Sequence, residues 1–460
     1  MPARELPRSL SSALQKAREV SSSLSSGAEA VRIISHYDAD GLCAAGILCR
    51  ALLKRAVPFH CTIVHSLDAA AIEALRLQDY PVTIFSDIGS GYLELLEGLN
   101  KRIIVIDHHG PVRDSKTVAQ LNCHLWGVNG AFEASASSLA LLFAVSLNET
   151  NWELAGLALA GSMGDRQHIG GWRGLNAEIL AVAERLGYAR TRRSLVMDGD
   201  TLVRALAESN EPFIRGVSGN PGGAAALVEA AGLSPAAAPG EIDPAGARAL
   251  ASLIALRLLK QGTPDEFVAS VLVDRHYLPG FGTDAAELSA VVNACGRLDR
   301  EELGLSVCMG SREALTEARE VRRQYRSHVM KRMLELQERG IQEMRHIQYF
   351  YAESASMGGA LAALVMNFLF PGPKPTVSLS SSGGRVKISL RGTREMTSRG
   401  LDLARAAAAA ARRCGGQGGG HSIAAGATIP LGMDMNFLEA LDTEVGAWLG
   451  GRAWGGGESG

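Results

Sequence analysis

Residues 103–110 read Ile-Ile-Val-Ile-Asp-His-His-Gly. Four β-branched apolar residues lead directly into one acid and two adjacent imidazoles. This pattern predicts a buried strand of a parallel sheet whose carboxyl end opens into a polar site. Asp107, His108 and His109 are therefore the first candidates for chemistry.

Three other stretches end in a similar way. A predicted strand over 30–35 leads into His36-Tyr-Asp38-Ala-Asp40-Gly, and a strand over 82–86 leads into Asp87-Ile-Gly-Ser-Gly. A predicted helix over 151–164 ends in Gly-Ser-Met-Gly-Asp165. Strands that alternate with helices indicate a parallel sheet, and such sheets bind ligands outside the carboxyl ends of their strands. We therefore expect these side chains to converge.

The remaining chain predicts further regions of an α/β fold. Residues 185–305 are rich in Ala and Leu and favour helices, and a hairpin is predicted over 376–390. The predicted regions are a parallel-sheet domain at 1–190, a mainly helical insertion at 191–310, a connector helix at 311–345, a smaller α/β domain at 346–450 and a disordered tail at 451–460.

The composition is that of a soluble globular protein. The chain has 460 residues, 47% of them hydrophobic, and a net charge of −2. No apolar run reaches the length of a membrane span, so we expect no membrane association. The seven cysteines are dispersed, which favours reduced thiols and a cytoplasmic location. Any nucleic-acid binding would have to come from local basic patches.

The candidate residues combine carboxylates with imidazoles and include no thiolate. This donor set suits a divalent ion such as Mn²⁺. Each motif alone also has a structural interpretation: Asp38-Ala-Asp40-Gly as a turn, Asp87 as a helix cap, and Asp107-His-His as a polar strand end. Together they predict a metal site. So many acids would repel one another without cations, which favours two bridged ions and hydrolysis of a phosphoester.

These motifs resemble the four motifs of the DHH phosphoesterase superfamily. The segment Gly418-Gly-Gly-His421 resembles the signature of its companion domain, DHHA1. Asn293-Ala-Cys-Gly-Arg297 and the stretch 313–319 resemble the RecJ branch. The likeness runs from about residue 30 to 430, is weakest at 190–290, and is strongest to archaeal RecJ-like single-strand-specific exonucleases.

The resemblance implies a role for each matching residue. Two divalent ions, Mn²⁺ or Mg²⁺, are expected, with Asp40 or Asp87 as the bridge. Asp107 would orient His108, and His109 would face the scissile phosphate. The implied metal ligands are His36, Asp38, Asp40, Asp87, His108 and Asp165. Many bacterial RecJ proteins have Asp where this chain has His36, and this departure resembles smaller phosphoesterases of the superfamily.

The substrate-binding candidates lie near the C-terminus. Gly418, Gly419 and Gly420 would let backbone amides approach an anion, helped by a helix predicted to start after them. His421 would then contact a phosphate; a flexible glycine linker is the alternative. Arg391 and Arg394 would bind phosphates or remain ordinary solvated arginines.

Three functions fit the sequence. The first is a two-metal exonuclease that acts on single-stranded DNA or RNA. The second is a phosphodiesterase for short oligonucleotides or dinucleotides, favoured by His36 and by the near-neutral charge. The third is a replisome component that docks on the GINS complex, since archaeal RecJ-like proteins are similar to its partners. Inorganic pyrophosphatase ranks low because such enzymes would lack Gly-Gly-Gly-His.

Overall fold

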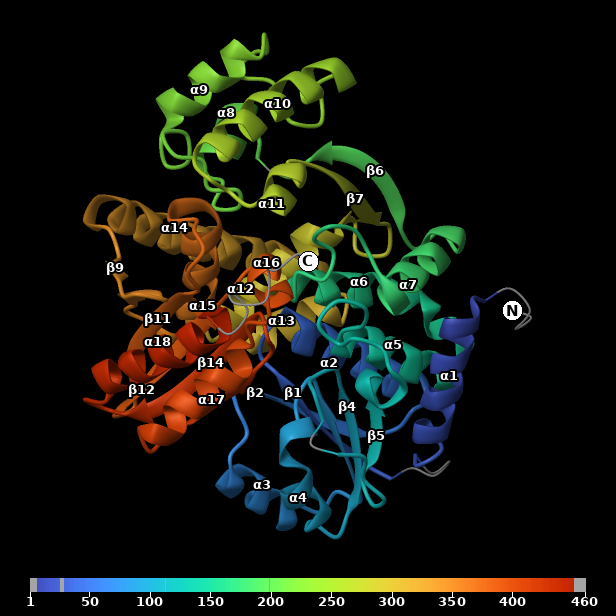
Figure 1. Cartoon of the computed structure of the whole chain (residues 1–460). Helices are drawn as coiled ribbons and strands as arrows, with labels where there is room; N and C mark the ends of the chain where they lie inside the picture. Colours follow the sequence, from blue (N-terminus) through green and yellow to red (C-terminus); the bar gives the residue numbers. More distant parts are fainter. Residues whose placement is uncertain (1–5, 25–28, 112, 198, 451–460) are drawn as a thin grey trace, which may run out of the picture. The chain divides into compact units, whose positions relative to one another are not determined.

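The computed structural model describes residues 6–24, 29–111, 113–197 and 199–450 (Figure 1). It divides into two compact units. The first contains the chain up to Arg193 together with Asp274–Tyr325, and the second contains Ser194–Val273 and the chain from Arg326 onward. The predicted disordered tail, 451–460, lies outside the described residues.

A five-stranded sheet forms the centre of the first unit. Its order is β2-β1-β3-β4-β5, and every neighbouring pair is parallel. The strands are β1 (Val31–His36), β2 (Phe59–Val64), β3 (Val82–Ser86), β4 (Arg102–Asp107) and β5 (Ala119–Asn122). The predicted parallel sheet is therefore confirmed, and the apolar run that ends at Asp107 is its fourth strand.

Both faces of this sheet are covered by helices, so its strands are apolar on both sides. Ile84 and Ile104 point into the larger core, whereas Phe85 and Val105 point into the smaller one. The larger core is built from α1 (Arg8–Ser21), α2 (Ala39–Lys54), α5 (Ala136–Leu147), α6 (Ala155–Gly164), α7 (Gly174–Arg185), α12 (Ala285–Arg297) and α13 (Glu301–Cys308); the smaller one from α3 (Ala69–Arg76) and α4 (Leu93–Glu97).

The strand order creates a switch point between β1 and β3. The chain goes from β1 to β2 on one side and then returns to β3 on the other side. In open α/β sheets, ligands bind outside the carboxyl ends of the strands at such a point. His36 ends β1 and Asp87 follows β3, so the topology places two of the predicted ligands there.

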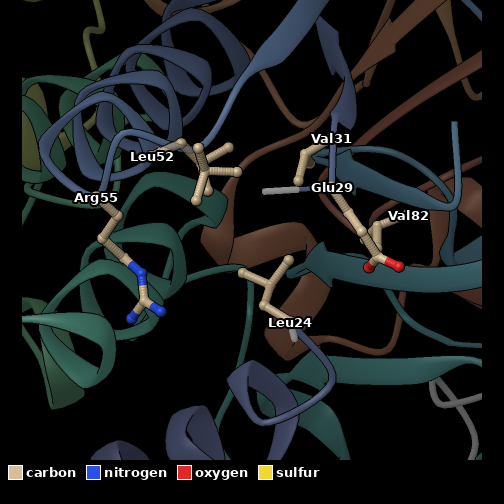
Figure 2. Close-up of a pocket in the computed structure, with 7 residues that line it drawn as sticks. Leu24, Glu29, Val31, Leu52, Arg55 and Val82 are labelled. Atoms are coloured by element: carbon tan, nitrogen blue, oxygen red, sulfur yellow. The ribbon is translucent and has the colours of Figure 1, made fainter. Parts of the chain in front are cut away.

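Figure 2 shows a small cavity at the opposite end of the same strands. Val31 and Val82 line it, and they are the first residues of β1 and β3. Its volume of about 10 Å³ is near the minimum for one water molecule. The cavity is therefore separate from the carboxyl ends of the strands, where the predicted ligands lie.

The insertion contains an unpredicted three-stranded sheet, ordered β6-β7-β8, beside its helices. Its strands are β6 (Arg190–Leu195), β7 (Leu272–Leu278) and β8 (Thr283–Asp284). β6 reads Arg-Thr-Arg-Arg-Ser-Leu and lacks apolar alternation, so local pattern gives no sign of it. The helices between β6 and β7 are α8 (Leu202–Ala207), α9 (Pro221–Ala230), α10 (Pro244–Lys260) and α11 (Asp265–Ala269).

The long charged helix predicted over 311–345 is α14, Arg312–Arg339; the prediction is wrong for 340–345, which contain the strand β9 (Gln342–Glu343). The hydroxyl of Ser311 accepts the amide hydrogen of Ala314 at 3.1 Å, which confirms the predicted N-cap. Gly340 follows with a φ of 74°, as is common where a helix ends. None of the described helices is both long and apolar enough to cross a membrane.

The second unit contains a six-stranded sheet, ordered β13-β14-β12-β11-β10-β9. The predicted hairpin is confirmed as the antiparallel pair β11–β12. α17 and α18 pack on the face that carries Val377 and Ile388, while α15 lies on the opposite face near Ser378. The bounds are β9 (Gln342–Glu343), β10 (Gln348–Tyr351), α15 (Ala355–Leu364), β11 (Thr376–Ser382), β12 (Arg385–Arg391), α16 (Arg394–Ser398), α17 (Leu403–Arg413), β13 (Gln417–Gly420), β14 (Ala424–Pro430) and α18 (Asp434–Gly450).

Candidate metal centre

The turn between β1 and α2 brings two predicted ligands together. His36 is the last residue of β1, and Asp38 caps α2 by accepting the Gly41 amide hydrogen at 3.1 Å. A Cβ atom on Gly41 would lie 2.3 Å from the His36 carbonyl oxygen, so only glycine permits this tight turn. Oδ2 of Asp38 lies 3.0 Å from Nδ1 of His36.

Asp40 lies in the first turn of α2 and is 1% exposed. Its Oδ2 accepts the amide hydrogen of Ala136 at 2.7 Å, and its Oδ1 accepts that of Ser137 at 3.0 Å. Both amides belong to the N-terminal turn of α5, which stabilises negative charge. A Cβ atom on Gly161 of α6 would lie 2.7 Å from Asp40 Oδ1, so glycine lets α6 approach this carboxylate.

Asp87 lies between His36, which ends β1, and His108, which follows β4. Its Oδ2 is 3.3 Å from Nδ1 of His36, and its Oδ1 is 3.3 Å from Nε2 of His108. Its φ of 59° is in the left-handed region, which Asp tolerates better than most residues. This backbone conformation follows directly after β3.

The six predicted metal ligands form two groups, in each of which the ligand atoms lie within 4.8 Å of one another. The first contains His36, Asp38 and Asp87; the second contains Asp40, His108 and Asp165. Nε2 of His108 is 3.2 Å from Asp165 Oδ2 and 3.8 Å from Asp40 Oδ2. Because Asp87 has one oxygen near each histidine, it connects the two groups.

Asp107 contacts His108 through the His108 backbone amide, which donates to Asp107 Oδ1 at 2.8 Å, and contacts the side chain of His109 rather than the ring of His108. Its Oδ1 accepts a hydrogen bond from His109 Nδ1 at 2.8 Å. The His108 ring instead has Nδ1 2.6 Å from the carbonyl oxygen of Gly130. In the neutral ring, donation to that carbonyl leaves the lone pair of Nε2 facing the carboxylates, as is usual for a metal-binding histidine.

The carboxylates of the site repel one another. Burial and repulsion from Asp87 raise the pKa of Asp40 to about 6. Burial also raises the pKa of Asp165 well above its usual value, although His108 opposes this shift. Burial would lower the pKa of His36, but the charges of Asp38 and Asp87 raise it well above the ordinary value. A bound cation would relieve this repulsion.

The residues present fit divalent cations. Among the described residues, His36 Nδ1 and Asp87 Oδ1 are shielded from solvent and have no hydrogen-bond partner of good geometry. Each nevertheless lies within 3.3 Å of a candidate ligand atom of another residue. Nitrogen and oxygen donors that converge in this way suit Mn²⁺, and a carboxylate-rich set is also compatible with Mg²⁺.

A buried polar network supports the second group, and sequence reasoning missed it. Gln167 Nε2 donates to the carbonyl oxygens of Gly130 at 2.9 Å and Ala134 at 3.2 Å. Its Oε1 accepts from Asn176 Nδ2 at 2.6 Å, and Asn176 Oδ1 accepts from Ser162 Oγ at 3.2 Å. The carbonyl oxygen of Gly130 is also the partner of the His108 ring. Gln167 therefore holds in place the carbonyl that orients this candidate ligand. Ser162, within Gly-Ser-Met-Gly, was the one available sequence signal.

Arg297 adds a positive charge beside the first group. It ends α12, and its guanidinium carbon lies 4.9 Å from the centre of the Tyr37 ring. It also donates a hydrogen bond to the Tyr37 hydroxyl. Burial opposes ionisation of Asp38, but His36 and then Arg297 hold the pKa of this carboxyl below its usual range. The Asn-Ala-Cys-Gly-Arg segment therefore contributes a cation to the site.

Two of the predicted substrate-binding residues meet at one end of the C-terminal sheet. Arg391 is the last residue of β12 and is paired with Ala424 of β14. The amide of His421 donates to the Ala424 carbonyl oxygen at 2.8 Å. Arg394 begins α16, and its Nη1 lies 3.4 Å from Oε2 of Glu266, so its charge is partly neutralised.

The glycine tract is not a loop that leads into a helix. Gly418, Gly419 and Gly420 belong to the edge strand β13, and the strand β14 follows, so the predicted helix start is wrong. A Cβ atom on Gly418 would lie 2.7 Å from the carbonyl oxygen of Ala407. The tract therefore allows close packing between β13 and the Ala-rich helix α17.

Comparisons with known proteins identify the family. The model of the DHH family, N-terminal domain, matches residues 30–162, and that of the DHHA1 domain matches residues 346–447. An uncharacterized protein of Methanocaldococcus jannaschii is 30% identical over 428 residues, which cover 91% of this chain and 94% of the relative. The chain belongs to the DHH/DHHA1 family. Its fold is accordingly α/β, with a parallel-sheet DHH domain and a C-terminal DHHA1 domain.

Solved structures share this fold. RecJ from Thermus thermophilus in complex with Mn²⁺ is 17% identical with a TM-score of 0.57; the match covers 96% of this chain and 56% of RecJ. This DHH/DHHA1 protein thus spans little more than half of that RecJ. An exonuclease RecJ bound to manganese matches at 17% identity and a TM-score of 0.55, with 94% of each chain covered. CDC45 from Entamoeba histolytica matches at 11% identity and a TM-score of 0.63, with coverages of 95% and 98%.

Proposed function

We propose that this DHH/DHHA1 protein is a metal-dependent phosphodiesterase that removes nucleotides from single-stranded DNA or RNA. The observation that carries the proposal is the pair of ligand groups joined by Asp87. An arrangement of this kind suits two divalent ions, and two-ion centres are a common device for hydrolysing phosphodiester bonds. Family membership and the RecJ fold support the same reaction class.

Each ligand group would hold one divalent ion, Mn²⁺ or Mg²⁺. His36 and Asp38 would bind one ion, His108, Asp40 and Asp165 the other, and Asp87 would bridge them. When bound, the ions supply an activated water molecule and Lewis-acid stabilisation of the phosphoryl group. The hydrogen bond to the Gly130 carbonyl keeps the His108 ring in the tautomer that ligation requires.

Residues around the ligands would act on the phosphate. Asp107 holds Nδ1 of His109, and the His109 side chain is 40% exposed, so its other nitrogen can face the substrate. Burial lowers the pKa of His109 but the Asp107 charge raises it, with a net upward shift that favours a positively charged donor. Arg297 would add electrostatic stabilisation of the same phosphate.

The remaining regions would serve binding and connection. We assign catalysis to 1–190, a helical insertion to 191–310, a connector to 311–345 and substrate binding to 346–450. Arg391 and His421, which lie at one end of the C-terminal sheet, would bind a phosphate of the substrate. The seven cysteines are all free thiols, which is consistent with a cytoplasmic location.

The proposal is tested with end-labelled DNA and RNA strands of several lengths, incubated with Mn²⁺ or Mg²⁺ and separated on a sequencing gel. We expect metal-dependent shortening from an end. Asp87→Asn should reduce the rate at least a hundredfold, because it removes the shared carboxylate charge. Asp68→Asn is the matched control, since Asp68 caps α3 and Asn preserves the cap. An Asp87→Asn rate equal to the wild-type rate would overturn the proposal.

A phosphodiesterase for short oligonucleotides is the second candidate, favoured by His36 in the first motif. It would cleave a dinucleotide faster than a thirty-nucleotide strand. A replication component that docks on GINS is the third. The likeness to CDC45 shows a shared fold, so a pull-down with purified GINS subunits is required to test this role.

A further inference from the structure

β6 and β7 form an antiparallel ribbon whose register is fixed by three contacts. The Val196 amide donates to the Val271 carbonyl oxygen at 3.0 Å. Thr191 Oγ1 lies 2.7 Å from His276 Nδ1, and Arg193 Nη1 lies 3.2 Å from Asp274 Oδ1. All three contacts join residues that are opposite each other in a single antiparallel register. Residues directly opposite in such a pair share a face.

At the end of the ribbon that contains Thr191 and His276, one face contacts Trp172 and α7. His276 is 2% exposed, accepts a hydrogen bond from Trp172 Nε1 at 2.8 Å and contacts the hydroxyl of Thr191. Thr191 in turn donates to Glu184 of α7. The opposite face, which we call the outer face, carries the alternate residues Arg190 and Arg192 on β6 and Arg275 and Tyr277 on β7.

The outer face presents an aromatic ring between cations. The register places Arg190 opposite Tyr277, which is 43% exposed, and Arg192 opposite Arg275. Arg275 is paired with Asp284 at 3.0 Å. In contrast, no acid within the described residues pairs with Arg190 or Arg192, and both are exposed. Although the chain as a whole is slightly acidic, this face is basic.

The outer face is joined to the candidate metal centre through α6. Leu278, next to Tyr277, lies against Gly156, where an added Cβ atom would be 3.1 Å from its Cδ1. Gly156 precedes Asp165 by nine residues, or about 14 Å along a helix. At the 3.4 Å per nucleotide of a fully stacked strand, this length corresponds to at most about four nucleotides, and an extended strand would cover it with fewer.

We propose that Arg190, Arg192 and Tyr277 bind single-stranded nucleic acid several nucleotides from the bond that is cut. Exposed arginines neutralise phosphates, and an exposed tyrosine offers a stacking surface for a base, which together are the usual elements of single-strand binding. This inference rests on the proposed function and deepens it. It makes a strand longer than a dinucleotide the preferred substrate.

The test compares the double variant Arg190→Ala/Arg192→Ala with wild type on a thirty-nucleotide strand and on a dinucleotide. We expect KM for the long strand to rise about tenfold or more, while kcat and dinucleotide turnover stay unchanged. Fluorescence anisotropy of the labelled thirty-mer in EDTA should show the same loss of affinity. Because two phosphate contacts are removed, the slope of log K against log salt should fall by about 1.4.

Three further variants separate the effects of base stacking and of charge from a loss of structure. Tyr277→Ala should weaken binding of the thirty-mer about tenfold, whereas Tyr277→Phe should retain it because the ring remains. Arg193→Ala is the control, since Arg193 lies on the other face and is paired with Asp274. It should bind the thirty-mer as wild type does.

Three outcomes would overturn the inference: unchanged anisotropy for the arginine double variant, equal losses on the long and short substrates, or weakened binding of an acidic peptide but not of the thirty-mer. Failure of the wild type to cleave any strand would count against the proposed function instead. In that case the anisotropy measurement still tests the outer face, because it needs neither metal nor catalysis.

Discussion

Replacing Gln167 with leucine tests whether the buried network positions the candidate ligand His108. The substitution keeps a side chain of similar size but removes two hydrogen bonds to the carbonyls of Gly130 and Ala134 and one from Asn176. Buried polar groups left without partners cost about 1–3 kcal/mol each. Since His108 continues to bind Gly130, we expect a loss of unfolding free energy of about 3 kcal/mol.

Metal affinity gives the more specific measurement. A Gly130 carbonyl that is no longer held by Gln167 would orient His108 less well, and loss of such support commonly weakens metal binding about 10- to 100-fold. Isothermal titration of the apoprotein with Mn²⁺ measures this, and urea unfolding measures the stability. Gln348→Leu is the matched control, because Gln348 is also buried and donates two hydrogen bonds, to Phe370 and Thr376 of the other unit.

The two variants should therefore lose comparable stability but differ in Mn²⁺ affinity. A Gln167→Leu protein that binds Mn²⁺ as tightly as wild type would refute the positioning role. Equal weakening by Gln348→Leu would also refute it, since the effect would then follow from general destabilisation.

Two further predictions concern stability. Burial lowers the pKa of His276, and the hydrogen bond from Trp172 requires its neutral ring, so the unfolded chain binds the proton more readily. The contribution of neutral His276 to stability is then fully present above about pH 6.5. Below that pH, the free energy of unfolding decreases by at most about 1.4 kcal/mol per pH unit. Urea unfolding at pH 7.5 and 5.5 should show a smaller fall for His276→Gln, and an equal fall would contradict this assignment. Gly418→Ala should lower the melting temperature because of the contact with Ala407, whereas Gly419→Ala, with open space around its Cβ position, should not; the reverse order would contradict the packing explanation.

The sequence predicted the candidate ligands because parallel-sheet topology places strand ends together. His36, Asp87 and Asp107 each end a strand or follow one. An apolar strand pattern followed by a polar residue was therefore sufficient to identify these three candidates. Asp40 and Asp165 lie on or directly after helices, so their place in the site was implied by the resemblance of their motifs to the DHH family rather than by a strand pattern. The partner of the His108 ring could not be predicted, because Gly130 approaches it through tertiary structure alone.

Other features depend on packing that no local pattern encodes. Gln167 and Asn176 lie on separate segments and become a network only when α6 and α7 pack together. The strand β6 is mostly arginine and threonine, and its pairing with β7 overrides a weak local preference. The glycines of β13 suggested an anion-binding loop, but they form a strand, and the close approach of α17 explains Gly418.

The most direct test of the central claim is anomalous X-ray diffraction from crystals grown with Mn²⁺. We predict two manganese peaks about 3.5–4 Å apart, one beside His36 and Asp38, the other beside His108 and Asp165, with Asp87 in contact with both. A single peak, or peaks only at surface acids, would contradict a two-metal centre.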